Sequence, residues 1–148
     1  MTEVPAAAKT ITEISGYSKI CLRYIHELAA EIIDLLKTTL YALCEARKPF
    51  LEKVQAKSTE IFDVWSGLNP HIKKLLFSHP DYIPSVQHDN LVNQSYQTSF
   101  LISSIEREVS SCCATKGPRA TDAKLAEFKA CFELLKSHLE GSLAAMKE

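Results

Sequence analysis

The chain has 148 residues, of which 46% are hydrophobic and 24% charged, and it contains four glycines. This composition is typical of one globular domain with its own core, and it excludes a disordered or low-complexity chain. Seventeen basic and eighteen acidic residues alternate without forming a basic run. Because nucleic-acid binding requires a basic surface for phosphate contacts, we do not expect DNA or RNA as a partner.

The first long segment with a regular apolar pattern extends from about Ser18 to Ala46. Apolar residues recur there at intervals of three and four, which predicts a helix with one buried face. Ser15 and Gly16 are expected to break the chain before this helix, and Ser18 to cap it. The predicted buried face consists of Cys21, Ile25, Leu28, Ile32, Leu35, Leu36, Thr39, Leu40 and Leu43.

A second helix is predicted from about Lys48 to Ser66. Proline is tolerated in a first helical turn but kinks an interior, so Pro49 marks the start of this helix. The alternative is one continuous helix with a kink at Pro49. Gly67 and Pro70 then predict a glycine cap followed by a separate short helix. The buried face of the second helix is expected to consist of Phe50 or Leu51, Val54, Ile61 and Trp65.

Two prolines in five residues, Pro80 and Pro84, exclude a helix and predict the main connector. Asp89 or Asn90 is expected to cap a third long helix, which the residues 115–118 end. Its predicted buried face consists of Leu91, Ser95, Thr98, Ile102, Ile105, Val109 and Cys112. The two polar members of this set weaken the first half of the pattern.

Thr121 is expected to cap the last helix, whose apolar residues alternate steps of three and four as in a coiled-coil-like seam. These residues are Leu125, Phe128, Phe132, Leu135, Leu139, Ser142 and Met146. Amphipathic helices joined by short breaks must pack together to bury their faces. The sequence therefore predicts an all-α protein, an irregular antiparallel bundle of four to five helices, with residues 1–8 as a flexible arm and residues 9–148 as a single domain.

Candidate metal ligands do not form a recognised pattern. Glu27 and Glu31 share one helical face, but a di-iron site would require Glu-x-x-His, which does not occur. His71, His79 and His88 lie in one loop-rich region without the spacing of a zinc site. We therefore expect a solvated acidic face, surface histidines, and neither a metal nor a cofactor.

The five cysteines are an odd set without CxxC spacing, which predicts reduced thiols that pack as small hydrophobic side chains. Of the adjacent pair Cys112 and Cys113, one is expected to pack and the other to face outward. The sequence shows neither the pattern of a signal peptide nor an apolar run long enough for a transmembrane segment. These features predict a cytoplasmic protein, with a nuclear location or a mature secreted form as alternatives.

No phosphate-binding loop, nucleophile elbow or kinase motif occurs, so we do not expect an enzyme. Well-patterned helices without such chemistry predict a protein that binds another protein, as an adaptor or as a subunit of an assembly. Phe77, Tyr82 and Ile83, near the prolines, are expected to anchor that partner. Lipid binding by the amphipathic bundle is the alternative, and the seam of the last helix also suggests a homo-oligomer.

Overall fold

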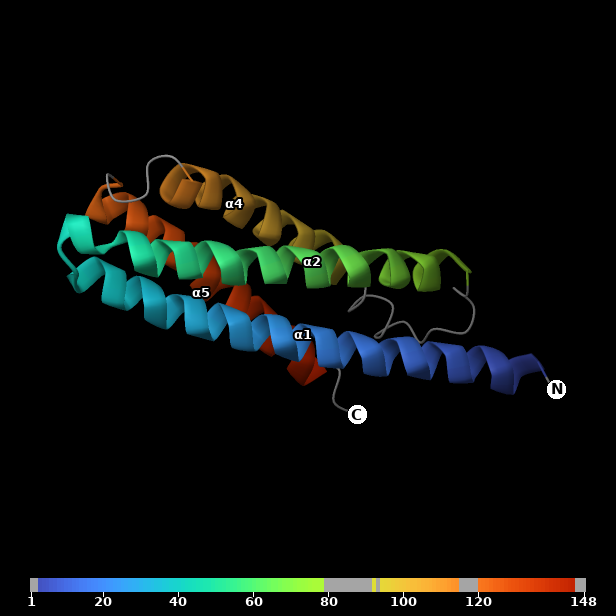
Figure 1. Ribbon diagram of the computed structural model, residues 1–148. Helices are drawn as coiled ribbons and strands as arrows, with labels where there is room; N and C mark the ends of the chain where they lie inside the picture. Colours follow the sequence, from blue (N-terminus) through green and yellow to red (C-terminus); the bar gives the residue numbers. More distant parts are fainter. Residues whose placement is uncertain (1–2, 79–91, 93, 115–119, 146–148) are drawn as a thin grey trace.

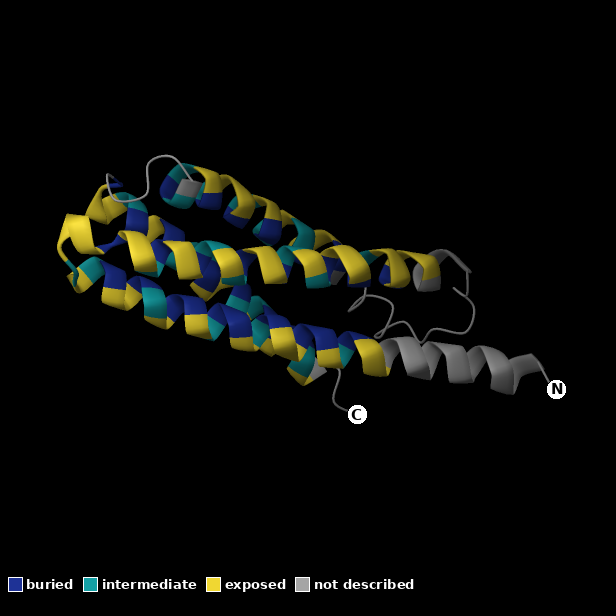
Figure 2. Ribbon diagram, viewed as in Figure 1, coloured by how far each residue is buried: buried dark blue, intermediate teal, exposed yellow. Residues whose placement is uncertain are grey.

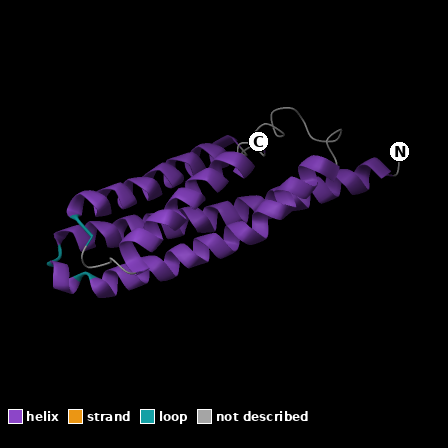
Figure 3. Ribbon diagram, turned by 90° about the horizontal axis from the view of Figure 1, so that it is seen from above, coloured by secondary structure: helices purple, strands orange, loops and turns teal. Residues whose placement is uncertain are grey.

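The computed structural model consists of helices joined by short turns. It describes residues 3–78, 92, 94–114 and 120–145, and the side chains within 16–74, 92, 95–113 and 120–144. The described residues contain no strand (Figure 3). They form the α-helices α1 (Glu3–Tyr41), α2 (Lys48–Ser78), α4 (Ser99–Val109) and α5 (Asp122–Ala145). A 3-10 turn, η1 (Cys44–Ala46), precedes α2, and the π-helical segments η3 (Gln94–Thr98) and η4 (Ser110–Ala114) extend α4 at its two ends.

Successive helices run in opposite directions and pack side by side (Figure 1). α1 contacts α2 and α5, and α4 contacts the same two helices, so α1 and α4 lie diagonally opposite each other. The predicted all-α antiparallel bundle is confirmed. It is irregular because the helices differ in length. α1 has 39 residues and α5 has 24, which correspond to about 58 and about 36 Å at 1.5 Å per residue. α1 and α2 therefore run on together past the ends of α4 and α5 (Figures 1 and 3).

The faces predicted from the apolar spacing form the core, while exposed residues cover the outside of the bundle (Figure 2). The predicted positions that are buried are Cys21, Ile25, Leu28, Ile32, Leu36, Thr39, Leu51, Val54, Ile61, Trp65, Ser95, Thr98, Ile102, Ile105, Val109, Cys112, Leu125, Phe128, Phe132, Leu135, Leu139 and Ser142. The prediction that Leu43 is buried is wrong. Its side chain is 73% exposed, because α1 ends at Tyr41 and the chain turns there. Leu91 and Met146 lie outside the described residues.

The predicted break before the first helix is wrong, because α1 is already helical at Glu3 and continues through Ser15 and Gly16. A glycine inside a helix costs about 1 kcal/mol relative to alanine, which a helix of 39 residues tolerates. Residues 3–8, expected to belong to a flexible arm, are part of α1. The division of the chain into an arm and a domain stays a prediction.

Pro49 lies in the first turn of α2, so the predicted start of the second helix is confirmed and the continuous kinked helix is wrong. The predicted glycine cap and separate short helix are also wrong, since α2 continues through Gly67 and Pro70 to Ser78. An interior proline costs about 3 kcal/mol because a backbone hydrogen bond is lost. Leu68 and Ile72, on either side of Pro70, are both fully buried, and their burial offsets this cost.

One buried charge, which the sequence did not predict, joins three elements at the α1–α2 turn. Arg47 is 4% exposed. Its Nε donates to the carbonyl of Ala42 at 3.2 Å, and its Nη2 donates to the carbonyl of Leu40 at 3.4 Å and to Asp122 Oδ1 at 2.7 Å. The guanidinium therefore satisfies carbonyls at the C-terminal end of α1 and holds the first residue of α5 beside them.

From Gln94 onward, the third predicted helix is α-helical only over Ser99–Val109, because π-helical segments occupy Gln94–Thr98 and Ser110–Ala114. Its expected caps, Asp89 and Asn90, lie outside the described residues. The predicted cap of the last helix is confirmed, since the backbone N–H of Lys124 donates to Thr121 Oγ1 at 3.1 Å.

Candidate functional site

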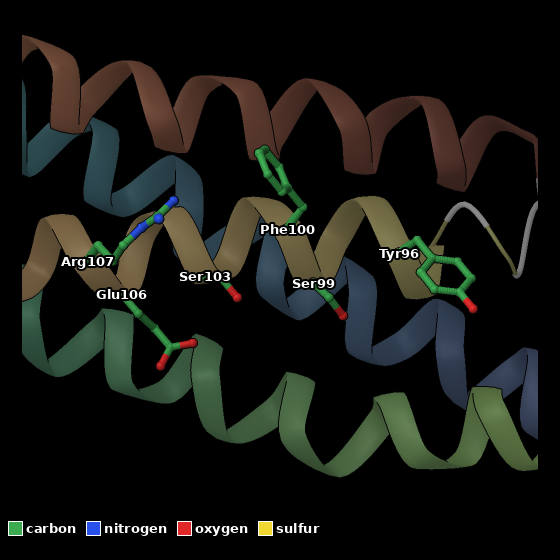
Figure 4. Close-up of a pocket in the computed structure, with 6 residues that line it drawn as sticks. All are labelled: Tyr96, Ser99, Phe100, Ser103, Glu106 and Arg107. Carbon is green, nitrogen blue, oxygen red and sulfur yellow. The ribbon is translucent and has the colours of Figure 1, made fainter.

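The outer face of α4 is the most distinctive surface among the described residues. A shallow groove open to solvent runs along it and is lined by Tyr96, Ser99, Phe100, Ser103, Glu106 and Arg107 (Figure 4). Tyr96 and Phe100 are each 69% exposed. Contiguous exposed apolar side chains often mark a site where a protein binds a partner. We call this set of six residues the α4 surface.

The position of these residues follows from the helical repeat. Tyr96, Phe100, Ser103 and Arg107 are separated by steps of four, three and four, so they follow one side of the helix. Ile102, Ile105 and Val109 occupy the opposite side and are buried. The core face of α4 therefore determines which residues its outer face presents to solvent.

The two edges of the α4 surface differ in chemistry. Phe100 and Arg107 point toward the α5 edge, whereas Ser99, Ser103 and Glu106 point toward the α2 edge (Figure 4). Arg107 Nη2 donates to Ser104 Oγ at 3.3 Å. Neither Glu106 nor Arg107 forms an ion pair with any residue that the structure describes. One edge is thus aromatic and basic, and the other carries hydroxyl groups and an acid.

Hydrogen bonds fix the α4 surface to α2. The indole Nε1 of Trp65, which is buried, donates to Ser99 Oγ at 3.2 Å, and Asn69 Nδ2 donates to the same oxygen at 3.5 Å. Ser95 Oγ donates to Asn69 Oδ1 at 3.1 Å. A buried indole N–H without an acceptor is costly, so these contacts specify how the first turns of α4 sit on α2.

Two polar contacts fix α4 to α5. Thr98 Oγ1 lies 2.9 Å from His138 Nε2, and Lys124 Nζ lies 3.0 Å from Glu108 Oε1. Burial lowers the pKa of His138, so the imidazole is neutral at neutral pH. These contacts set the register of the two antiparallel helices. Because Thr98 lies beside His138 and the helices are antiparallel, residues that follow Thr98 lie beside residues that precede His138. Leu134, which is exposed, lies one helical turn before His138 and is therefore close to the level of Phe100.

The other exposed aromatic residues either contact a neighbouring side chain or lie away from the groove. The ring of Tyr17 packs edge-on against His71 at 5.9 Å between centroids, and the hydroxyl of Tyr24 donates to Glu60 at 3.0 Å. Tyr41 is 92% exposed at the α1–α2 turn. The α4 surface combines a groove, neighbouring exposed aromatic side chains and two charged side chains that form no ion pair with the described residues.

The anchors predicted in the connector stay predictions. Phe77 lies in the last turn of α2, where the helix is described but its side chain is not. Tyr82 and Ile83 lie outside the described residues. Tyr96 and Phe100 were not predicted as site residues from the sequence, although their spacing places them on the face opposite the predicted core.

The acidic face forms an ion pair, and burial affects both of the adjacent cysteines, Cys112 and Cys113. Glu31 is exposed and pairs with Lys57 at 2.8 Å, and among the described residues no group of three His, Cys, Asp or Glu side chains could hold a metal ion. His79 and His88 lie outside them. Burial raises the pKa of Cys112 to about 11 and that of Cys113 to about 12. Both thiols are therefore protonated at neutral pH. Cys112 is buried, and Cys113 is partly buried and packs against the core.

Comparison with known proteins gives no relative: the chain matches no family model, no curated protein and no solved structure. None of the described helices has the length and apolarity that crossing a membrane would require. We therefore infer a function from the α4 surface.

Proposed function

We propose that this protein acts by binding another protein, and that the partner docks on the α4 surface. The observation that carries this proposal is the pair Tyr96 and Phe100, both mostly exposed, on a hollowed helix face that hydrogen bonds hold rigidly in place. Covering both side chains would remove roughly 200 Å² of apolar surface from water, worth about 5 kcal/mol before the costs of association.

The chemistry of the surface favours a helix as the docking element. A groove along a helix receives the apolar side of another helix, and aromatic side chains commonly contribute most of the binding energy at such sites. Because Trp65 and Asn69 already hold Ser99, α4 needs little reordering when the partner binds. The protein would then work as an adaptor or as a subunit of an assembly. Phe77, Tyr82 and Ile83 remain proposed as a second contact region, and lipid binding stays a prediction.

Site-specific photo-cross-linking in the native source tests the proposal. A photoreactive phenylalanine analogue is placed at Ser103, inside the groove, or at Tyr41, which is highly exposed at the far end of the bundle. We expect defined adducts from the first position and none of the same mass from the second. Phe100→Ala in the Ser103 background should abolish those adducts while leaving the helix content unchanged.

Two results of the same cross-linking experiment would contradict docking on the α4 surface. If position Ser103 gives no adduct, or if its adducts persist when Phe100 is truncated, the α4 surface is not where a partner docks. Adducts of equal mass and yield from both positions would show non-specific contact.

A further inference from the structure

We infer that residues 94–99, which we call the latch segment, form a pH-sensitive latch: protonation of His138 separates them from α5 and α2 while the rest of α4 stays packed. The latch segment consists of η3 and the first residue of α4. Its opening requires no partner at the α4 surface, so the latch goes beyond the proposed function.

The contact between Thr98 and His138 attaches the latch segment to α5. Thr98 Oγ1 lies 2.9 Å from His138 Nε2, and the side chain of Thr98 is fully buried. A neutral imidazole can form this hydrogen bond without bringing a charge between the helices. Burial lowers the pKa of His138, so the closed contact favours the neutral ring. The protonated ring is better stabilised in water, which it reaches when the contact opens.

No carboxylate is placed to stabilise the protonated ring in the closed state. Among the residues that the structure describes, His138 has no ion-pair partner. The acid that follows it on α5, Glu140, lies 3.2 Å from Nε2 of His26 on α1 and 3.6 Å from Lys136 Nζ. The hydrogen bond with His26 and the charge of Lys136 lower the pKa of Glu140. Glu140 therefore already has partners on the other side of α5.

The remaining titratable groups on the facing elements are directed elsewhere. On α1, Arg23 and Glu27 flank His26 and are exposed. In η3 the titratable group is Tyr96, whose side chain is 69% exposed. Arg107 and Glu108 lie more than two turns beyond Thr98 along α4. His138 is thus the group whose protonation acts on the contact with η3.

Polar side chains attach η3 to the bundle. Of the described side chains in η3, those that are buried belong to Ser95 and Thr98. Ser95 Oγ donates to Asn69 Oδ1 on α2 at 3.1 Å, while Thr98 contacts α5. The buried apolar residues of α4 come later, at Ile102, Ile105 and Val109. Because apolar burial supplies most of the packing energy, the latch segment opens at a lower cost than the rest of α4.

The backbone of η3 also favours local opening. It is π-helical, a rare conformation that occurs mostly as single turns and frequently at functional sites. The turn lies between the hydrogen bonds that hold it to α2 and to α5. Loss of the contact with His138 leaves it attached on one side only.

The pH range of the latch follows from the histidine. In the open state His138 lies in water and protonates near its ordinary pKa of 6.5, whereas burial lowers its pKa in the closed state. The closed state is therefore favoured above this pH and loses stability below it. If the closed ring stays neutral, lowering the pH from 7.0 to 5.5 raises the ratio of open to closed molecules about eightfold, which is the limit for one proton.

Hydrogen exchange of the full chain at pH 7.0 and 5.5, corrected for the intrinsic effect of pH on exchange, tests the latch. We expect the protection of residues 95–99 to fall about three- to eightfold at the lower pH. Protection in Ile102–Val109 and in Leu28–Leu36 should stay the same. The chain has one tryptophan, and the indole N–H of Trp65 donates to Ser99 Oγ at 3.2 Å. Its single NMR signal should lose protection together with residues 95–99.

Three variants separate the histidine from its surroundings. His138→Gln keeps a polar side chain beside Thr98 but does not titrate, so the effect of pH on residues 95–99 should disappear. His26→Gln is the matched control, because it removes a histidine that contacts Glu140 and not η3; the effect should persist. Thr98→Val removes the hydroxyl at similar shape, so residues 95–99 should exchange faster already at pH 7.0.

Four results would overturn the latch. Residues 95–99 could keep equal protection at both pH values, or lose it equally in His138→Gln. A loss of protection in all helices together would show that His138 acts on the whole bundle. Unchanged exchange of residues 95–99 in Thr98→Val would show that the contact does not hold them. The experiment contains no partner, so each of these results would leave the proposed function standing.

Discussion

Replacing Arg47 tests whether the bundle depends on the capping of α1 or on an ion pair. Arg47→Ala removes a buried guanidinium that donates to the carbonyls of Leu40 and Ala42 and to Asp122. Hydrogen bonds to a charged group are each worth about 1.5–3 kcal/mol net. The carboxylate of Asp122 is 73% exposed, so water solvates it after the substitution, and the ion pair itself contributes about 1 kcal/mol or less. Nη1 has no hydrogen-bond partner, which further lowers the net value.

We therefore expect Arg47→Ala to lower the free energy of unfolding by about 2–3 kcal/mol, most of it from the carbonyls left without a donor. For a chain of 148 residues this corresponds to a decrease in Tm of about 6–10 °C. Urea unfolding followed by circular dichroism measures the free energy, and calorimetry measures Tm.

Two control variants separate the contributions. Asp122→Ala should cost about 1 kcal/mol or less, since it removes only the exposed member of the pair. Arg47→Lys should recover part of the stability, because the ammonium retains the charge but cannot reach both carbonyls and the carboxylate at once. If Asp122→Ala is as destabilising as Arg47→Ala, the ion pair is the main contribution and the capping of the α1 carbonyls is not.

Three further predictions follow from groups elsewhere in the bundle. Gly67→Ala should stabilise the protein by about 1 kcal/mol in urea unfolding, because a Cβ there meets no atom within 4 Å and glycine weakens a helix interior. Burial lowers the pKa of His138 below its ordinary value of 6.5, so the unfolded chain binds the proton more readily; stability should fall as the pH drops below about 6.5, and His138→Gln should remove that part of the pH dependence. At pH 7.5, iodoacetamide should label Cys44 well before Cys112 or Cys113, whose thiols remain protonated, as peptide mass spectrometry can follow.

Each of these expectations has a contrary result. A loss of stability in Gly67→Ala would mean that the glycine relieves strain in α2. An unchanged difference in stability between the wild-type protein and His138→Gln from pH 8 to 5 would show that the imidazole titrates alike in both states. Equal labelling rates at all three cysteines would indicate that the end of α4 opens on the time scale of the reaction.

Local sequence patterns predicted the buried face of the third helix but not the long-range contacts that position the candidate site. Ser95 and Thr98 were placed on the buried face of the third helix by spacing alone, and both are buried. Their hydrogen-bond partners, Asn69 and His138, come from α2 and α5, at separations of 26 and 40 residues that no local pattern encodes. Tyr96 and Phe100 follow the same helical repeat, but whether another helix covers their side of α4 depends on how many helices the bundle contains.

The sequence by itself determined which side of each helix faces the core, because a repeat of 3.6 residues and the cost of exposing apolar side chains act within one segment. It also determined the start of α2 at Pro49 and the cap of α5 at Thr121, since these signals act within one helical turn. Only the tertiary structure decided that α2 continues past Pro70, because the burial of Leu68 and Ile72 outweighs the local cost of the proline. The tertiary structure likewise buried Arg47 and left the α4 surface open, because both outcomes depend on neighbours that are distant in the chain.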